Sequence, residues 1–145
     1  MSSLPHLDPA GHARMVDVGA KPVTTRVATA AGRLQVSAEV IELLRGNGLP
    51  KGDALAVAQI AAIAGTKRTA DLIPLCHPIR LDGVEITVTC RTNDRTGVEM
   101  EALTGVAVAG LALHDMVKAV DPAAVLTDVQ LIAKTGGRSG DWRRS

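Results

Sequence analysis

Residues 96–122, TGVEMEALTGVAVAGLALHDMVKAVDP, constrain the fold of this chain more than any other segment. Residues 96–121 lie in the longest stretch without proline, and apolar residues run almost unbroken from Ala102 to Leu113. The segment has a helix start and a helix stop, because Thr96 can cap a first turn and Asp121-Pro122 cannot continue a helix. A helix that is apolar on nearly every side is buried all round. We therefore expect the remaining elements to pack around it.

Charged side chains stand at both ends of this predicted helix. Glu99 and Glu101 fall in the first turn, where the helix dipole favours negative charge. Asp115 and Lys118 are three positions apart and share a face. Glu101 and Asp115 project to nearly the same side but lie roughly 20 Å apart along the axis. Two chains packed antiparallel along this helix could join the two carboxylates in one site across a two-fold interface. The alternative interpretation is that the glutamates only cap the helix and that Asp115 and Lys118 form an ordinary surface ion pair.

The composition bounds the class of protein. The chain has 145 residues, enough for a single domain over 1–145, with a flexible arm at 1–14 and a glycine-rich tail at 135–145. A net charge of +1 and the lack of aromatic residues other than one Trp argue against nucleic-acid binding. Two cysteines without a CxxC motif predict neither a disulfide framework nor a zinc site. This cysteine usage suits a reducing cytoplasm, where we expect the protein to be. No apolar run reaches membrane-spanning length, and the N-terminus has no apolar signal core.

Lysine is used sparingly among the basic residues. Only five of the 16 are lysines: Lys21, Lys51, Lys67, Lys118 and Lys134. A lysine kept in an arginine-rich chain can indicate a position that needs a compact ammonium able to lose its proton, and chance explains the count equally well. The glycine-rich tail after Lys134 can wrap an anionic ligand with backbone amides or can be a frayed terminus.

Local patterns predict strands mixed with helices. Ser37 and Asp53 are placed to cap two helices, and Gly65-Thr66 is placed to break the second. The predicted elements are strands at 23–28 and 33–36 joined by an Ala-Ala-Gly bulge, helices at 38–45 and 54–73, a strand at 83–91, the long helix, and a strand at 125–134 whose Val125, Thr127, Val129, Leu131 and Ala133 share one face. This order predicts an α+β fold, an antiparallel sheet with helices packed on one face.

The segment DLIPLCHP, residues 71–78, is predicted to be a rigid extended loop, because two prolines four apart leave no room for a helix or central strand. Cys76 and His77 lie in its middle, where a histidine suits a proton shuttle or a hydrogen bond to substrate. A histidine bonded to nearby backbone and a buried cysteine acting as a small apolar residue are equally consistent. A Cys–His nucleophilic pair is disfavoured because neighbours in an extended chain point apart, and a metal would need more ligands than the loop offers.

Four motifs taken together, MVDVGAKPVTTRVA, KGDALAVAQIAAIAGTKRTADLIPLCHPI, TGVEMEALTGVAVAGLALHDMVKAVDP and AKTGGRSGD, resemble the molybdenum cofactor biosynthesis C (MoaC) family over nearly the whole chain. The resemblance implies a ferredoxin-like α+β fold and a homohexamer, a trimer of dimers, with active sites at the dimer interfaces. It implies a lyase that converts a cyclised dihydro-GTP into cyclic pyranopterin monophosphate and releases pyrophosphate in molybdopterin biosynthesis.

The resemblance also implies roles for individual residues. Asp115 would be the catalytic acid or base, with Lys118 beside it. The residues that would bind the substrate are Leu75, Cys76, His77, Glu99, Met100, Glu101, Lys51, Lys67 and Lys134. Proton transfers during ring opening and closure need such acid–base groups, and departing pyrophosphate is stabilised by cations. No cofactor or metal site is implied, although a divalent cation can accompany the triphosphate.

The sequence departs from the family pattern in two places. Between Gly83 and Thr96 it is short by about one hairpin, because one strand is predicted where members have two; this is a true deletion or an omitted loop. His114 stands before Asp115 where members often carry an aromatic residue. The alternative function is therefore a catalytically inactive, hexameric nucleotide-binding paralogue, against which the retention of every polar site residue argues.

Overall fold

We describe the fold from a computed structural model of the chain. The structure describes residues 9–13, 19–46, 48–50, 52–80, 83–85, 89–94 and 97–145, with backbone alone for 83–85 and 89–94. Thr96, Lys51 and most of the predicted N-terminal arm lie outside the described residues.

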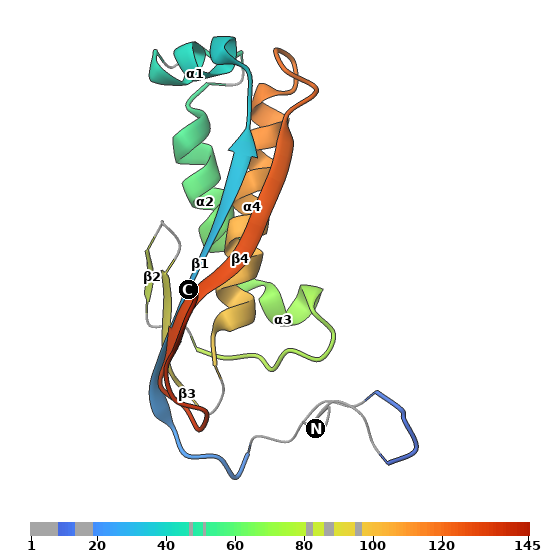
Figure 1. Ribbon diagram of the computed structural model, residues 1–145, viewed down its shortest axis with the longest axis vertical. Coiled ribbons are helices and arrows are strands. Elements are labelled where there is room, and N and C mark those ends of the chain that lie inside the picture. The colour runs from blue at the N-terminus through green and yellow to red at the C-terminus, as the bar shows by residue number, and fades with distance from the viewer. Residues whose placement is uncertain are drawn as a thin grey trace.

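One antiparallel sheet organises the described part of the chain, with strands in the order β2-β3-β1-β4-β5 (Figure 1). The strands are β1 (Thr24–Gln35), β2 (Gly83–Glu85), β3 (Thr89–Asp94), β4 (Val125–Thr135) and β5 (Trp142–Arg143). The central strand is β1, which pairs with both β3 and β4. The chain therefore returns to its first strand twice, and residues far apart in sequence meet along β1.

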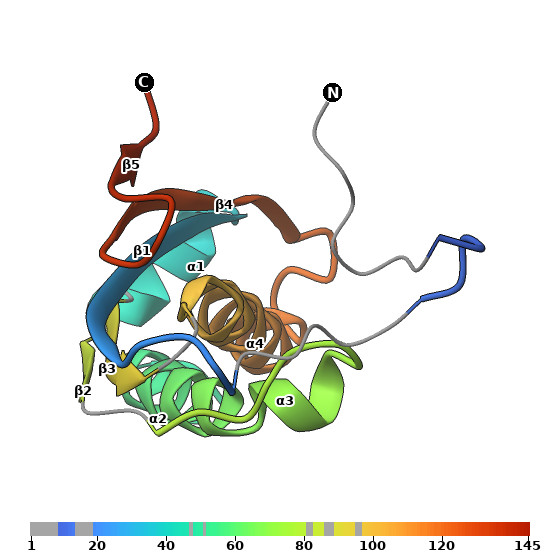
Figure 2. The same ribbon diagram turned by 90° about the horizontal axis from the view of Figure 1, so that it is seen from below.

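Two long helices lie on one face of this sheet. The helices are α1 (Ala38–Arg45), α2 (Ala54–Lys67), α3 (Thr69–Leu72) and α4 (Glu99–Val117). Figure 2 shows α4 between the sheet and α2, and α4 contacts α2, β1 and β4. The predicted α+β fold with helices on one face is confirmed, and the long apolar helix is its centre.

Small residues let these layers approach closely. Ala28 and Ala30 of β1, Ala62 of α2 and Ala102 of α4 are fully buried in one cluster. A Cβ added at Gly65 of α2 would lie 3.0 Å from the Val108 side chain of α4. Because close-packed interiors leave no spare volume, glycine and alanine set the short distance between the layers.

The predicted helix caps at Ser37 and Asp53 are confirmed. The Ser37 hydroxyl accepts from the Val40 amide at 3.4 Å, and the Asp53 carboxylate accepts from the Ala56 amide at 3.1 Å. The helix predicted over 54–73 is interrupted, but at Arg68 and not at Gly65-Thr66, because α2 continues to Lys67 and α3 begins at Thr69. Gly65 is buried against α4 and serves packing rather than termination.

The bounds of the central helix differ from the prediction at both ends. It begins at Glu99 with Val98 at the N-cap position and no side-chain cap, and it ends at Val117. Asp121 is four residues beyond that end, where its carboxylate accepts from the amides of Ser37 at 2.9 Å and Ala123 at 3.1 Å. Asp121 therefore builds a turn that ties the end of α4 to the start of α1.

The predicted single strand over 83–91 is wrong. The chain reverses within it, so that β2 and β3 form a short hairpin with Gly83 opposite Arg91 and Glu85 opposite Thr89. The connecting residues 86–88 are Ile-Thr-Val and contain none of the Gly, Asn, Asp or Pro that mark tight turns. The apolar alternation continues through the reversal, which explains why the pattern predicts one strand.

The predicted apolar face of the last strand is also wrong in its first half. Leu126 faces Gly110 of α4, and Leu131 packs against the core cluster of β1 and α4. Residues five apart cannot share a face of a regular strand. Asp128 adopts a φ of 54°, and the pairing of β1 with β4 shifts register between Ala31 and Arg33. This bulge turns β4 over, and it lies opposite the Ala-Ala-Gly bend predicted in β1.

The length and apolar composition of α4 are those of a membrane-crossing helix. This differs from the expectation that no apolar run is long enough. In the structure, α2 and the sheet cover α4, and its first turn contains the buried Glu101. These contacts are those of a core helix.

Candidate active site

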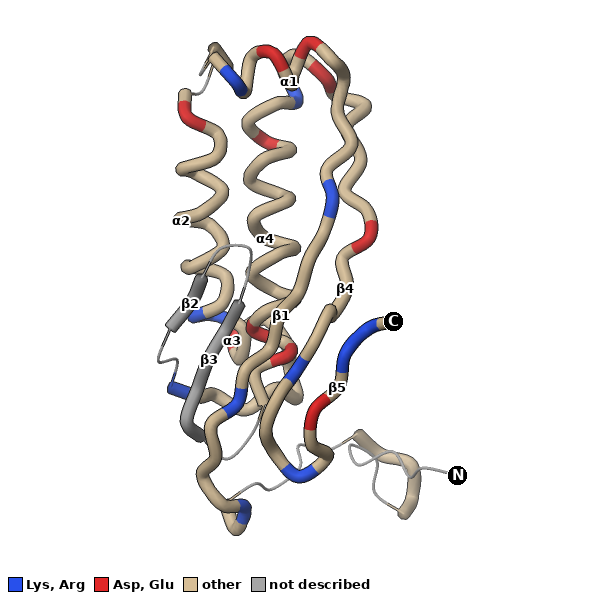
Figure 3. The backbone as a smooth tube through the Cα atoms, turned by 60° about the vertical axis from the view of Figure 1, so that its left-hand side comes forward, with Lys and Arg blue, Asp and Glu red and all other residues tan. Residues whose placement is uncertain are grey.

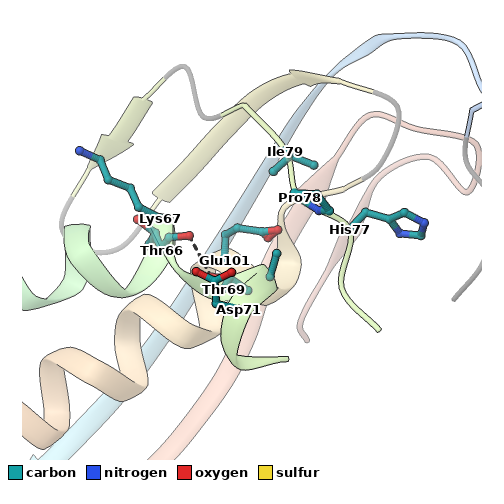
Figure 4. A pocket seen from close by; sticks show the side chains of 9 residues that line it. Thr66, Lys67, Thr69, Asp71, His77, Pro78, Ile79 and Glu101 are labelled. Carbon is teal, nitrogen blue, oxygen red and sulfur yellow. Dashed lines mark hydrogen bonds between the residues drawn. The ribbon is translucent and has the colours of Figure 1, made fainter. Parts of the chain in front are cut away.

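A cavity of ≈ 300 Å³ lies where the end of α2, α3, the loop after α3 and the start of α4 meet (Figure 4). It is lined by Thr66, Lys67, Thr69, Ala70, Asp71, His77, Pro78, Ile79 and Glu101. Three residues predicted from the sequence, Lys67, His77 and Glu101, are thereby brought together from separate elements. The predicted extended loop at 71–78 is wrong in its first part, because Asp71 and Leu72 belong to α3 and residues 74–75 form a turn. Residues 76–80, which include Pro78, have no regular secondary structure.

Glu101 is the most unusual group in this cavity. The residue is only 2% exposed, and its Oε2 has no hydrogen-bond partner in the described part of the chain. Its Oε1 accepts from the Cys76 thiol at 3.7 Å. Burial raises the pKa of Glu101 to about 7, and the charge of Glu99 acts in the same direction. Glu101 can therefore hold or release a proton near neutral pH.

Cys76 is held as a thiol. Burial raises its pKa to about 11, with further contributions from the charge of Glu101 and from the hydrogen bond to it. Its sulfur lies 3.7 Å from the backbone carbonyl oxygen of His77. Because the thiolate is the nucleophilic form of cysteine, this environment is unsuited to nucleophilic catalysis by Cys76.

The two threonines of the cavity are engaged with backbone. Thr66 Oγ1 donates to the Ile63 carbonyl at 2.7 Å, and Thr69 Oγ1 lies 2.9 Å from the Thr66 carbonyl. These bonds support the turn between α2 and α3. Figure 4 shows Lys67 and His77 on either side of Glu101, with their charged or polar ends pointing in opposite directions. Sequence reasoning missed Thr66, Thr69, Asp71 and Ile79, although all lie in the motif that carries the resemblance.

A second cavity, of ≈ 620 Å³, is basic. It is lined by Ala20, Lys21, Pro22, Thr24, Arg26, Gly137 and Arg138, and the buried Thr24 Oγ1 has no partner in the described part of the chain. Figure 3 shows basic positions of β1, β4 and the turn before β5 gathered at this end of the sheet, beside acidic positions at the start of α4. The sequence motifs that contain Lys21 and Arg138 could have indicated this cavity, but Arg26 and Arg138 were not assigned to a site from the sequence.

The glycine-rich tail is folded in the structure. Gly136 and Gly137 have φ values of 81° and 80°, and the Gly136 amide donates to Asp141 at 3.1 Å. Lys134 Nζ donates to Ser139 Oγ at 2.7 Å and lies 4.0 Å from Glu99 Oε1. Lys134 therefore contacts both Ser139, which follows Arg138 of the basic cavity, and Glu99 at the start of α4, where Glu101 lies.

Asp115 and Lys118 form the predicted pair on one face of α4. Lys118 Nζ lies 2.7 Å from Asp115 Oδ1, and the two side chains are 54% and 51% exposed. The pair is at the opposite end of α4 from Glu101, so one chain does not bring the two carboxylates together. Met100 is 37% exposed and Leu75 is half-buried; neither lines the cavity around Glu101. Lys51 lies outside the described residues.

No metal site is evident in the part of the chain that the structure describes. None of the described His, Cys, Asp and Glu residues form a group of three or more that could hold a metal ion. The chemistry of the described residues is that of proton-transfer groups beside a basic cavity.

Comparison with known proteins identifies the family. The model of the MoaC family matches residues 15–137. This chain belongs to the MoaC family. Among its MoaC relatives, cyclic pyranopterin monophosphate synthase of Streptomyces coelicolor is 62% identical, over 98% of this chain and 90% of the relative. The enzyme of the same name in Streptomyces griseus is 62% identical, over 98% of this chain and 86% of the relative. Cyclic pyranopterin monophosphate synthase 2 of Mycobacterium tuberculosis is 54% identical, over 97% of this chain and 91% of the relative.

This MoaC chain is shorter than its relatives within the aligned region. The alignment to the Streptomyces coelicolor enzyme spans 153 positions, whereas 98% of 145 residues is about 142. About 11 aligned positions therefore have no counterpart here. This difference has the size of the shortening inferred near 83–96, where the structure contains a hairpin of strands three and six residues long.

Proposed function

We propose that this chain is a cyclic pyranopterin monophosphate synthase, a lyase of molybdenum cofactor biosynthesis. The observation that carries the proposal is its 54–62% identity to proteins of that name over nearly its full length. The substrate would be a cyclised dihydro-GTP, and the products would be cyclic pyranopterin monophosphate and pyrophosphate. The cytoplasm would be its location.

The residues around the first cavity suit this chemistry. Rearranging a purine into a pterin requires repeated proton transfers, for which groups that titrate near neutral pH are efficient. Glu101 is such a group, because its pKa is about 7 and its Oε2 has no partner among the residues that the structure describes. His77 and Lys67 line the same cavity and can bind an oxygen-rich ligand.

We assign the triphosphate to the basic cavity. Lys21, Arg26 and Arg138 supply three cations around one space, and cations that meet developing charge help pyrophosphate to leave. Lys134 contacts Ser139, next to Arg138 in the sequence, and lies 4.0 Å from Glu99, so we infer that one ligand spans both regions. Any divalent cation would enter with the triphosphate.

Arg138→Ala tests this assignment. We expect it to weaken binding of pyrophosphate about tenfold at low salt, because one charge-assisted contact to phosphate is lost, and to have a smaller effect at high salt. Titration calorimetry with pyrophosphate at two salt concentrations measures both values. Arg45→Ala is the matched control, because Arg45 pairs with Glu42 on α1. Equal affinities of the Arg138 and Arg45 variants at low salt would remove the triphosphate from this cavity.

We further infer that a second copy of the chain completes the site, in a ferredoxin-like homohexamer built as a trimer of dimers. Glu101 and Asp115 are roughly 20 Å apart on one helix, so they meet only between chains. The outer face of α2 supports such packing, since Leu55 and Ile60 are 56% and 68% exposed. A groove over that face includes Ile60 and Ile63 and shares Lys67 and Asp71 with the site. An apolar helix face continuous with a site fits a partner subunit.

Pyrophosphate release tests the proposed function. The purified protein, supplied with the cyclised dihydro-GTP, is expected to release one pyrophosphate for each pterin formed, measured by a coupled phosphate assay and by chromatography of the product. Binding without release would favour the alternative, a catalytically inactive nucleotide-binding paralogue. Absence of both binding and release would contradict the proposal.

A further inference from the structure

We propose that Cys76 is a positioning residue for Glu101. The thiol proton of Cys76 moves between two acceptors, and its position influences whether the carboxyl group of Glu101 is neutral or ionised when a ligand binds. The inference rests on the proposed function for the identity of that ligand, and on the geometry alone for the coupling between the two side chains. It assigns Cys76 a role other than direct contact with substrate.

The thiol has one proton and two acceptors at the same distance. Cys76 Sγ lies 3.7 Å from Glu101 Oε1 and 3.7 Å from the carbonyl oxygen of His77. When Glu101 is ionised, the charged Oε1 is the better acceptor, because hydrogen bonds to charged groups are the stronger ones. When Glu101 is neutral, that advantage disappears and the thiol can donate to the His77 carbonyl.

The other acidic and basic side chains near Glu101 come from each of the elements that surround it. Glu99 is on α4, Lys67 ends α2, Asp71 is on α3, His77 is in the loop, and Lys134 of β4 reaches Glu99. In the part of the chain that the structure describes, the thiol of Cys76 is the side-chain hydrogen-bond donor to the Glu101 carboxyl group. The thiol is therefore placed to set the balance between the neutral and ionised carboxyl.

The unpaired oxygen gives this balance a consequence for binding. Oε2 of Glu101 is buried and without a partner in the described part of the chain, and Glu101 lines the cavity. A ligand that presents an N–H group to Oε2 favours the ionised carboxylate. The carboxyl proton then leaves to solvent, and the thiol proton turns to Oε1, so that both oxygens accept a hydrogen bond.

The direct test is a titration of Glu101 in the ligand-free protein. Carbon-13 NMR of side-chain-labelled glutamate gives the titration midpoint, and loss of the signal in Glu101→Gln assigns it. We expect Cys76→Ser to lower the midpoint by about one pH unit, because a hydroxyl is a stronger donor to a carboxylate than a thiol. Asp71→Asn is the control, because Asp71 lines the same cavity but is not one of the groups that change the pKa of Glu101. A Cys76→Ser midpoint equal to that of the unmodified protein or of Asp71→Asn would overturn the proposal.

A second measurement reads the same coupling from the sulfur. We expect Glu101→Gln to speed alkylation of Cys76 by iodoacetamide about tenfold at pH 8, because removing the negative charge and the charged acceptor makes the thiolate easier to form. Peptide mass spectrometry separates Cys76 from Cys90. An unchanged rate would contradict the coupling. Both tests use the protein without ligand, so a failure of pyrophosphate release would refute the proposed function alone.

Discussion

Asp115→Asn is expected to reduce pyrophosphate release about a thousandfold, because an amide cannot exchange a proton at the reacting centre. The fold should be preserved. Asp115 is half-exposed and its ion pair with Lys118 is of the surface kind, which contributes less than about 1 kcal/mol. Steady-state kinetics with the cyclised dihydro-GTP and circular dichroism would measure the two effects. Glu42→Gln, which breaks the equivalent pair with Arg45 on α1 at 2.9 Å, should leave activity unchanged. An active Asp115→Asn protein would remove Asp115 from its proposed role.

Mixing two inactive proteins then tests whether the site spans two chains. Asp115→Asn and Glu101→Gln subunits, unfolded together and refolded at equal amounts, should regain up to about a quarter of the normal activity. Half of randomly formed dimers would be mixed, and each mixed dimer would contain one site with both native carboxylates. Refolding each variant alone is the control. If the mixed assembly forms and stays inactive, the two carboxylates do not belong to one shared site.

Glu101→Gln is expected to raise stability at pH 8 while it abolishes most activity. The pKa of Glu101 is raised from its ordinary 4.5 to about 7 in the folded protein. Between pH 4.5 and about 7 the folded state therefore holds a proton on Glu101 that the unfolded state has lost. The contribution of this proton to the free energy of unfolding is full below pH 4.5 and is lost as the pH rises through about 7. The loss is on the order of 2–3 kcal/mol. Glutamine is neutral at every pH, so the Glu101→Gln protein should not lose this stability as the pH rises.

Urea unfolding of both proteins at pH 5 and pH 8, at one protein concentration, measures this difference. Glu39→Gln provides the control, because Glu39 is in the first turn of α1 and exposed. If Glu101→Gln and the unmodified protein lose the same stability between the two pH values, Glu101 is not the group responsible. The expected result would mean that the chain accepts a destabilising buried carboxylate, which is typical of a group used in function.

Much of the local structure could be predicted from the sequence. Ser37 and Asp53 cap their helices as expected, because a cap depends on a side chain and an amide two or three residues away. The central position of α4 followed from its apolar composition, and the pairing of Asp115 with Lys118 followed from their spacing. The motifs around Cys76 and Glu101 were sufficient to indicate the MoaC family.

The features that make the site depend on contacts between distant segments. Nothing near Glu101 in the sequence indicates that the thiol of Cys76 lies against its carboxyl group, or that the packed molecule buries this carboxyl group and so raises its pKa toward neutrality. Arg26 and Arg138 line one basic cavity because β1 pairs with β4. The sequence pattern did not predict the hairpin formed by β2 and β3 or the bulge at Asp128. Alternation of apolar residues indicates which face of a strand is buried. It does not indicate a chain reversal or an inserted residue when no turn-forming residue marks it. Side-chain periodicity is a local property, whereas the register between strands and the desolvation of a carboxylate are properties of the packed molecule.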